Sequence, residues 1–308
     1  MNYKILLIGY GSIAQKHINA LSNISCENSI TALRSNHTNN NNASLTNIFD
    51  LKELTYTPDF IIISNPSYLH EETIFKVLHL NSTLFIEKPV ISNLHNSNLV
   101  LMNIAKNNIK SYVACNLRFH PALIWAKSNL LFETNKINEV NIYCGSYLPD
   151  WRSNINYKNS YSSKSIMGGG VHLDLIHEID YCYWLFGKPL LVSSKKRNVS
   201  TLDISSYDFA SYCIAYTNFS VNIILNYYRR DNKRELEILT NDTTYKIDLI
   251  NNKIEDLVNK NILYHEKFEI FDTYQNQMKY FLDNLNSKID YENNIEKSIE
   301  VLKIALNE

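Results

Sequence analysis

Side chains able to carry or accept protons follow a run of glycines in the second half of the chain. Residues 168–170 are all glycine, and Asp174, His177 and Glu178 come shortly after them. Taking the proton from a hydroxyl group needs a base near neutral pKa, such as histidine. One continuous helix would place Asp174 and His177 about 60° apart on one face. We interpret His177 as a general acid or base oriented by Asp174. A role exchange between His177 and Glu178, and a purely structural helix, are the alternatives.

A glycine turn follows the first apolar run of the chain. Gly9, Gly11 and Ala14 form the pattern Gly-x-Gly-x-x-Ala, which includes Ser12 and Ile13. The first glycine permits a tight turn, the second lets a pyrophosphate approach the backbone, and the small third residue lets helix and strand pack closely. The phosphate would lie at the helix N-terminus. The pattern predicts a dinucleotide site, and a turn with only a structural role is the alternative.

The residues expected at the end of the second strand bear on the choice of dinucleotide. Arg34 and Ser35 stand there in place of Asp or Glu. A carboxylate would bind the ribose 2′-hydroxyl of NAD, whereas an arginine would accommodate the 2′-phosphate of NADP. We therefore expect NADP or NAD as cofactor, with a preference for NADP. Alternatively, Arg34 stacks on the adenine or points to water.

Apolar runs alternate with helical patterns over the first 118 residues. The run 60–63 is wholly apolar, which is typical of a parallel strand covered on both faces. Such alternation predicts a doubly wound parallel sheet in a Rossmann-type domain, residues 1–118. The expected strands are 3–8, 30–33, 60–63, 84–86 and 112–115.

The pattern changes after residue 118, where we expect an α+β domain, residues 119–308. Several β-rich stretches lie between 190 and 250, and 207–216 and 221–228 read as a hairpin. These stretches predict a large, mostly antiparallel sheet. Helical patterns near 271–285 and 295–306 close the chain, and the C-terminal helix could pack back on the first domain.

Composition limits the class of protein. The net charge of the 308 residues is −1, so nothing indicates a nucleic-acid partner. No apolar stretch reaches the roughly 18–20 residues that cross a bilayer, and residues 3–8 read as a strand better than as a signal peptide. The five cysteines are odd in number and lack metal-ligand spacing. We expect free thiols, no metal site and a cytoplasmic location.

Four motifs, taken in order, resemble the Gfo/Idh/MocA family (glucose-fructose oxidoreductase, inositol dehydrogenase and relatives). They are Ser64–His70 (SNPSYLH), Glu87–Pro89 (EKP), Asn116–Pro121 (NLRFHP) and the segment from Gly168 to Asp180. The resemblance runs from residue 1 to near the C-terminus. It implies a Rossmann domain followed by an α/β domain with a large antiparallel sheet. It also implies NAD(P)-dependent oxidoreductase chemistry on sugars or sugar derivatives, and homodimers or homotetramers built through that sheet. The segment around Trp151 resembles a subgroup of bacterial surface-sugar pathways, with nucleotide-linked amino sugars and acidic nine-carbon sugars as examples.

The resemblance also assigns roles to residues. Lys88 corresponds to the family's catalytic lysine, whereas the spacing of Asp174 and His177 departs from the commoner family spacing of four. Residues expected at the cofactor, besides the glycine turn, are Arg34, Ser35, Asn65, Pro66, His70, Glu87 and Lys88, although a structural role is the default for His70. Residues expected at the substrate are Asn116, Arg118, Trp151, Arg152, Tyr157 and Glu178; ordering of loops or domains is the alternative for most of them.

Two further functions are compatible with this family. One is a hydrolase that retains its cofactor and uses transient oxidation to cleave a glycosidic bond. The other is a dinucleotide-binding regulator without catalysis, against which the presence of both Lys88 and His177 argues. The leading interpretation is a dehydrogenase or reductase acting on a secondary hydroxyl or carbonyl of a sugar.

Overall fold

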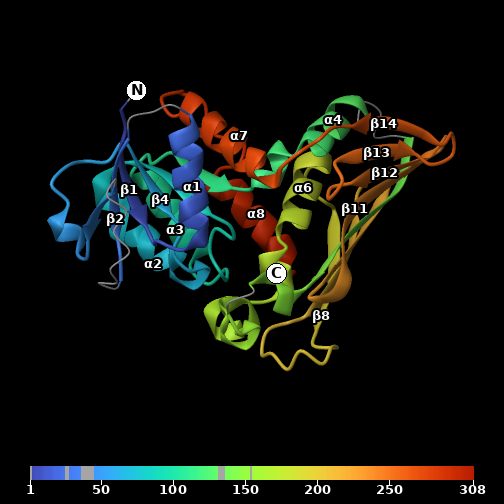
Figure 1. The fold of residues 1–308 in the computed structure, drawn as a ribbon, viewed down its shortest axis with the longest axis horizontal. Coiled ribbons are helices and arrows are strands. Elements are labelled where there is room, and N and C mark those ends of the chain that lie inside the picture. Colours follow the sequence, from blue (N-terminus) through green and yellow to red (C-terminus); the bar gives the residue numbers. More distant parts are fainter. Residues whose placement is uncertain (1, 25–27, 36–44, 131–135, 153–154) are drawn as a thin grey trace. The chain divides into compact units, whose positions relative to one another are not determined.

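The computed structural model describes residues 2–24, 28–35, 45–130, 136–152 and 155–308 (Figure 1). The chain divides into two compact units. The first contains Met1–Asn116 and Phe271–Leu302, and the second contains Leu117–Ile270 and Lys303–Glu308.

The first unit contains a six-stranded sheet in the order β3-β2-β1-β4-β5-β6, in which every neighbouring pair is parallel. All four side chains of β4 are buried, as expected for a strand covered on both faces. The strand order reverses direction between β1 and β4, where doubly wound sheets bind ligands at the carboxyl ends of their strands. The strands are β1 Lys4–Ile8, β2 Ser29–Leu33, β3 Leu45–Ile48, β4 Phe60–Ile63, β5 Thr83–Glu87 and β6 Ser111–Ala114.

A C-terminal helix completes the core of this first unit. The Phe281 ring on α7 packs against Phe60, Phe85 and Tyr112, with centroid distances of 5.0, 5.1 and 5.8 Å. Residues 271–302 therefore join the first unit, whereas the sequence-based division grouped them with 119–308. The helices are α1 Ser12–Asn23, α2 His70–Val77, α3 Ser97–Lys106, α7 Ile270–Asp283 and α8 Ile295–Leu306.

The second unit contains an eight-stranded sheet in the order β14-β13-β12-β11-β7-β10-β9-β8. Its pairs are antiparallel except β10 with β7. Buried and accessible side chains alternate along β9 and β10, and these two strands form the predicted hairpin. The strands are β7 Ile137–Tyr147, β8 Leu191–Arg197, β9 Phe209–Ala215, β10 Ser220–Asn226, β11 Tyr228–Thr240, β12 Thr244–Asp248, β13 Lys253–Asp256 and β14 Asn261–His265.

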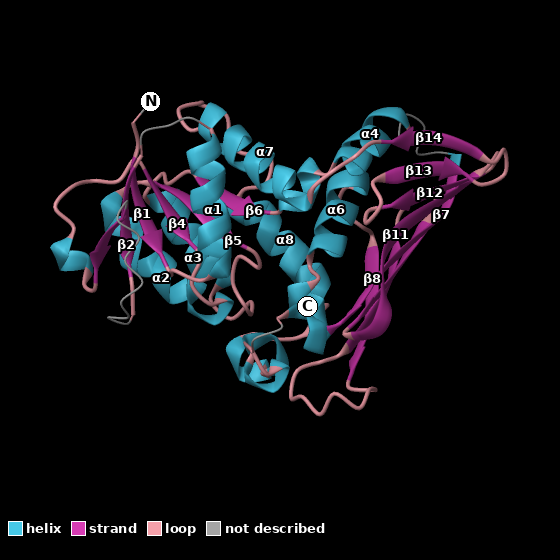
Figure 2. Ribbon diagram, viewed as in Figure 1, coloured by secondary structure: helices cyan, strands magenta, loops and turns pink. Residues whose placement is uncertain are grey.

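Helices lie along one face of this second sheet. Figure 2 shows α4 (Pro121–Asn129) and α6 (His177–Phe186) beside it. The short helix α5 (Val171–Asp174) contacts β9 and β10. A doubly wound parallel sheet and a large, mostly antiparallel sheet confirm the predicted fold class. Within the described ranges, no helix is long and apolar enough to cross a membrane.

Replacing Phe281 with alanine should lower the free energy of unfolding by about 3–5 kcal/mol, because a fully buried ring leaves a cavity. Chemical denaturation followed by circular dichroism measures this change. Ile289→Ala is the control, since Ile289 is 79% exposed and its loss should change stability by less than about 0.5 kcal/mol. Equal effects of the two substitutions would contradict the packing of α7 on the first sheet.

Candidate functional site

The glycine turn lies between β1 and α1, and its two glycines have different roles. Gly9 has a φ of +88°, and a Cβ there would lie 2.6 Å from the backbone nitrogen of Asn65. Only glycine fits this close approach between the turns that follow β1 and β4. Gly11 has φ −88° and ψ −171°, which any residue adopts, and a Cβ on it would meet nothing within 4 Å. Gly11 therefore faces open space.

The N-terminus of α1 fits a phosphate. Gly11 is its N-cap and offers no side-chain cap, and the first turn carries no acidic residue. The first backbone N–H groups of a helix have no partners within the helix, and the helix dipole favours an anion there. Ser12 is exposed and Ile13 is half-buried, so the first turn is accessible. This arrangement matches the pyrophosphate site expected from the sequence.

A guanidinium group lies beside the same turn. Arg34 follows β2, and its Cζ lies 4.9 Å from the ring centroid of Tyr10, the residue between the two glycines. Its Nη1 donates to Asn47 Oδ1 at 3.4 Å. Arg34 is half-buried and Ser35 is exposed. A cation and a hydroxyl are thus available where a dinucleotide carries its ribose.

The turn after β4 presents an unsatisfied acceptor. Asn65 Nδ2 donates to Thr73 Oγ1 at 2.7 Å, which fixes the amide. Asn65 Oδ1 is buried and, among the described residues, has no hydrogen-bond partner. A buried carbonyl oxygen without a donor is costly, so a ligand N–H such as a carboxamide would suit it. Pro66 follows and is exposed.

A buried carboxylate holds the end of β5. Glu87 Oε1 lies 2.6 Å from His17 Nε2 on α1, and Glu87 Oε2 accepts the backbone N–H of Lys88 at 3.1 Å. Burial alone would raise the pKa of Glu87, but the hydrogen bond and charge of His17 outweigh it and lower that pKa. Glu87 is thus ionised and already engaged, so it supports Lys88 and does not bind the cofactor itself. The Lys88 side chain is half-buried, and the Lys88–Pro89 peptide bond is cis.

His70, expected at the cofactor, is turned into the protein. It is 1% exposed, and its two ring nitrogens lie 2.9 and 3.0 Å from the carbonyl oxygens of Asn65 and Pro89. Neither nitrogen is left for a ligand. The prediction that His70 contacts the cofactor is therefore replaced by a structural role, in which His70 links two turns.

The expected single helix after the three glycines is broken. Helix α5 ends at Asp174, Leu175 has φ −98° and ψ 32°, and α6 begins at His177. Asp174 and His177 therefore do not share a helix face, contrary to the three-residue spacing argument. His177 is half-buried, whereas all its neighbours from Val171 to Asp180 are buried. His177 is thus the accessible titratable group of this segment.

Asp174 is held by tyrosines that the sequence analysis missed. The Tyr227 hydroxyl donates to Asp174 Oδ2 at 2.5 Å, and burial and the aspartate charge raise the pKa of Tyr227. Asp174 is also the main cause that raises the pKa of Tyr161. Tyr227 lies 53 residues from Asp174 between two strands, and no local motif marks it. Asp174 is an anchored acceptor and not a freely moving base.

Two residues expected at the substrate make internal hydrogen bonds. Arg118 Nε and Nη2 donate to the two carboxylate oxygens of Asp180 at 2.8 and 2.7 Å, and both side chains are buried. Asn116 Nδ2 donates to Thr273 Oγ1 at 2.7 Å and is also buried. The charge of Arg118 is thus paired within its own unit, so the structure does not favour its predicted role in binding a substrate carboxylate.

Glu178 and Tyr157 also make internal contacts. Glu178 is fully buried, and its Oε1 lies 2.8 Å from Arg234 Nε on β11. Burial raises the pKa of Glu178 despite this partner. The Tyr157 hydroxyl donates to the Leu202 carbonyl at 3.0 Å. The exchange of roles between His177 and Glu178 therefore has no geometric support, because Glu178 is enclosed.

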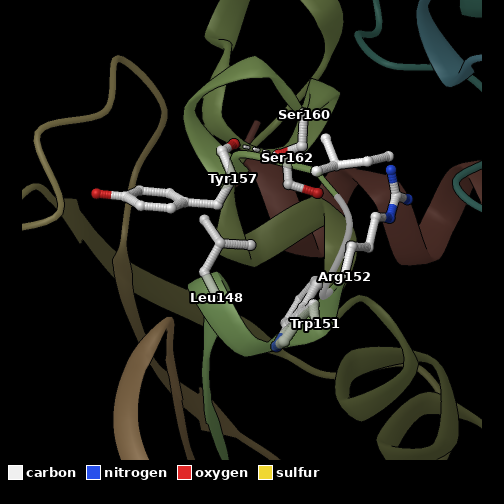
Figure 3. Close-up of a pocket in the computed structure, with 7 residues that line it drawn as sticks. Leu148, Trp151, Arg152, Tyr157, Ser160 and Ser162 are labelled. Atoms are coloured by element: carbon white, nitrogen blue, oxygen red, sulfur yellow. Dashed lines mark hydrogen bonds between the residues drawn. The ribbon is translucent and has the colours of Figure 1, made fainter.

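Trp151 and Arg152 line a small pocket of the second unit (Figure 3). Trp151 Nε1 donates to Ser146 Oγ at 2.8 Å, and its ring meets Tyr227 edge-on at 5.3 Å. The Arg152 guanidinium lies 5.4 Å from the Tyr161 ring centroid. In Figure 3 the Arg152 guanidinium and the Tyr157 ring point to opposite sides of the pocket. Arg152 forms no ion pair with an acidic side chain in the described part of the chain.

Comparison with known proteins identifies relatives for the first unit. Residues 3–114 match the model of the oxidoreductase family GFO_IDH_MocA, described as an NAD-binding Rossmann fold. A levoglucosan dehydrogenase of Pseudarthrobacter phenanthrenivorans is 29% identical over 143 residues, which cover 45% of this chain and 36% of that protein. The chain thus spans little more than a third of this curated relative.

Solved structures share the whole fold. The UDP-N-acetylglucosamine 3-dehydrogenase GnnA of Acidithiobacillus ferrooxidans superposes with a TM-score of 0.80 at 16% identity, covering 100% of this chain and 96% of that one. The WlbA dehydrogenase of Bordetella pertussis, in complex with NADH and UDP-GlcNAcA, gives 0.78 at 15% identity, with 99% and 94% covered. At these identities the likeness shows the fold alone.

Breaking the Arg118–Asp180 pair should destabilise the protein rather than weaken substrate binding. Arg118→Met should cost about 3–5 kcal/mol, because it leaves a buried carboxylate without its partner. The double variant Arg118→Met/Asp180→Leu should recover part of that loss. Thermal unfolding measures both. A stable Arg118→Met protein with a raised KM for an acidic substrate would contradict the internal pairing.

Proposed function

We propose that the chain belongs to the Gfo/Idh/MocA oxidoreductase family, whose model residues 3–114 match, and that it is an NAD(P)-dependent dehydrogenase or reductase of sugars. It transfers a hydride between a nicotinamide and a secondary hydroxyl or carbonyl of a sugar or sugar derivative. One observation carries this proposal: the uncapped glycine turn after β1 and Lys88 after β5 lie at the same carboxyl edge of one parallel sheet.

The cofactor residues of the proposal lie at the turns that follow β1, β2 and β4. Gly11, Ser12 and Ile13 at the start of α1 would hold the pyrophosphate, and Arg34 with Ser35 would meet the adenosine ribose. The nicotinamide carboxamide would donate to the buried Asn65 Oδ1. When bound, the nicotinamide supplies the hydride acceptor or donor.

Lys88 handles the reacting oxygen in this proposal. Its ammonium group stabilises the negative charge that develops when a hydroxyl loses its proton, and it donates a proton in the reverse direction. The Glu87 carboxylate fixes the backbone N–H of Lys88, which limits where the side chain can be directed. Positioning of this kind contributes a large part of enzymatic rate enhancement.

His177 is the proposed second acid or base, and Asp174 is an electrostatic support. The Asp174 carboxylate accepts from Tyr227 and interacts with Tyr161, so its negative charge is fixed in place. A fixed aspartate favours protonated, positively charged groups in its surroundings. His177 is half-buried, and an imidazole can both accept and donate a proton.

The proposed substrate carries an apolar ring face and an anionic group. Trp151 is 36% exposed and could stack on a sugar ring, and Arg152 offers an accessible guanidinium in the same pocket. Nucleotide-linked amino sugars and acidic nine-carbon sugars have both features. Support comes from two similarly folded proteins, of which one is a UDP-N-acetylglucosamine 3-dehydrogenase and the other is in complex with UDP-GlcNAcA.

Replacing Lys88 with methionine should lower kcat by roughly 10²–10⁴-fold and leave cofactor binding intact. The assay follows nicotinamide absorbance with NADP or NAD and a panel of nucleotide sugars, free sugars and nine-carbon acids. Lys106→Met is the matched control. Lys106 is exposed at the end of α3, so its replacement should leave kcat unchanged. Undiminished turnover in Lys88→Met would contradict the proposed role.

Replacing Arg34 with alanine should reduce kcat/KM for NADP by roughly 10- to 100-fold, since a charge-assisted contact with the 2′-phosphate is lost. The value for NAD should change little, because NAD has no such phosphate. Steady-state kinetics with both dinucleotides measures the ratio. Equal losses with NAD and NADP would show that Arg34 acts on the adenine or on the fold of the turn.

A further inference from the structure

A buried histidine bridges two turns at the carboxyl edge of the first sheet. His70 begins α2 and is 1% exposed. Its Nδ1 lies 3.0 Å from the carbonyl oxygen of Pro89, and its Nε2 lies 2.9 Å from that of Asn65. Asn65 lies just beyond β4, Pro89 just beyond β5, and these two strands are neighbours in the sheet. One imidazole ring therefore spans the turn expected at the nicotinamide and the turn that presents Lys88.

The backbone of Lys88 is fixed on both sides by buried side chains. Its own N–H donates to Glu87 Oε2 at 3.1 Å, and the carbonyl of the next residue, Pro89, faces His70 Nδ1. Glu87 is itself held by His17 at 2.6 Å. A peptide unit with both flanking polar groups occupied has little freedom to rotate. The direction of the Lys88 side chain therefore depends on His70 as well as on Glu87.

We propose that His70 is a positioning residue for Lys88, with its Nδ1–H donating to the Pro89 carbonyl. This inference rests on the proposed function, in which Lys88 handles the proton of the substrate hydroxyl. His70 touches neither substrate nor cofactor and acts through the backbone of Lys88–Pro89. Nε2 would donate to the Asn65 carbonyl, 2.9 Å away, only in the doubly protonated ring.

The neutral ring supplies one donor, and the inference places it on Nδ1. A neutral imidazole carries one N–H, so it donates to only one of two facing carbonyl oxygens. Donation from Nδ1 to a backbone carbonyl is a common way to fix a histidine tautomer. Burial lowers the pKa of His70, although the facing carbonyls and Glu87 favour the charged form, so the ring is neutral near pH 7.

Two amide substitutions separate the two contacts. In His70→Asn the amide nitrogen replaces Nδ1 and keeps the donor to Pro89, whereas in His70→Gln it replaces Nε2 and keeps the donor to Asn65. His70→Asn should retain kcat within about threefold, and His70→Gln should lower it by roughly 10- to 100-fold, as expected when a reacting group is misplaced. KM for the cofactor should change little in His70→Asn. His79→Asn and His79→Gln are the controls, because His79 is exposed just beyond α2.

Imidazole ¹⁵N NMR of histidine-labelled protein tests the hydrogen bond without turnover. His70→Asn identifies the His70 signals, which should show a protonated Nδ1 and an unprotonated Nε2 at pH 7. The opposite tautomer, or equal kcat losses in His70→Asn and His70→Gln at equal melting temperature, would overturn the inference. If no sugar is turned over by the wild type, the proposed function fails, yet the NMR result still decides whether His70 donates to Pro89.

Discussion

A buried hydrogen bond between Glu87 and His17 fixes the edge of the first sheet. Burying a carboxylate is costly unless hydrogen bonds compensate, and here His17 Nε2 at 2.6 Å and the Lys88 N–H at 3.1 Å supply them. His17 lies on α1, whose N-terminus is the expected phosphate site, and Glu87 ends the strand that presents Lys88. The contact therefore links the helix at the expected phosphate site to the strand that presents Lys88. Removing either partner would leave a buried group unsatisfied.

The second unit keeps most of its buried charges in internal pairs. Arg118 is joined to Asp180, Glu178 to Arg234, and Asp174 accepts from Tyr227. These contacts hold the short helices against the sheet. They also engage several side chains that were candidates for substrate binding. Among the candidate residues of this unit, Trp151 and Arg152 are exposed, and Tyr157 and His177 are half-buried. Few side chains of this unit therefore remain as candidates for substrate contact or proton transfer.

Local patterns in the sequence were enough to predict several of the elements, although not strand β3. The apolar strand at 60–63, the glycine turn and the hairpin between β9 and β10 each depend on neighbouring residues, and each is confirmed. The break after Asp174 could not be read from spacing, because the sequence of residues 171–186 looks continuously helical; in the structure Leu175 departs from helical angles. The short helix α5 forms because Gly170, with φ +135°, lets the chain enter it from a sharp turn.

Long-range pairs were beyond the reach of the sequence. His17 and Glu87 are 70 residues apart, and Arg118 and Asp180 are 62 apart, so no motif joins them. Arg118 was expected at the substrate because it follows a strand and suits an anionic group, and Glu178 because one continuous helix would place it near Asp174 and His177. The fold satisfied these charges internally instead, since an unpaired buried charge would be unfavourable.

Binding of NADPH and NADH to Gly11→Val, measured by nucleotide fluorescence against the wild type, tests the account most directly. A Cβ at Gly11 meets no protein atom within 4 Å and its backbone angles suit any residue, so the variant should fold with an unchanged melting temperature. Its side chain would fill the space assigned to the pyrophosphate, and we predict that binding of both dinucleotides is lost. A stable variant that binds them as tightly as the wild type would show that the phosphate site lies elsewhere.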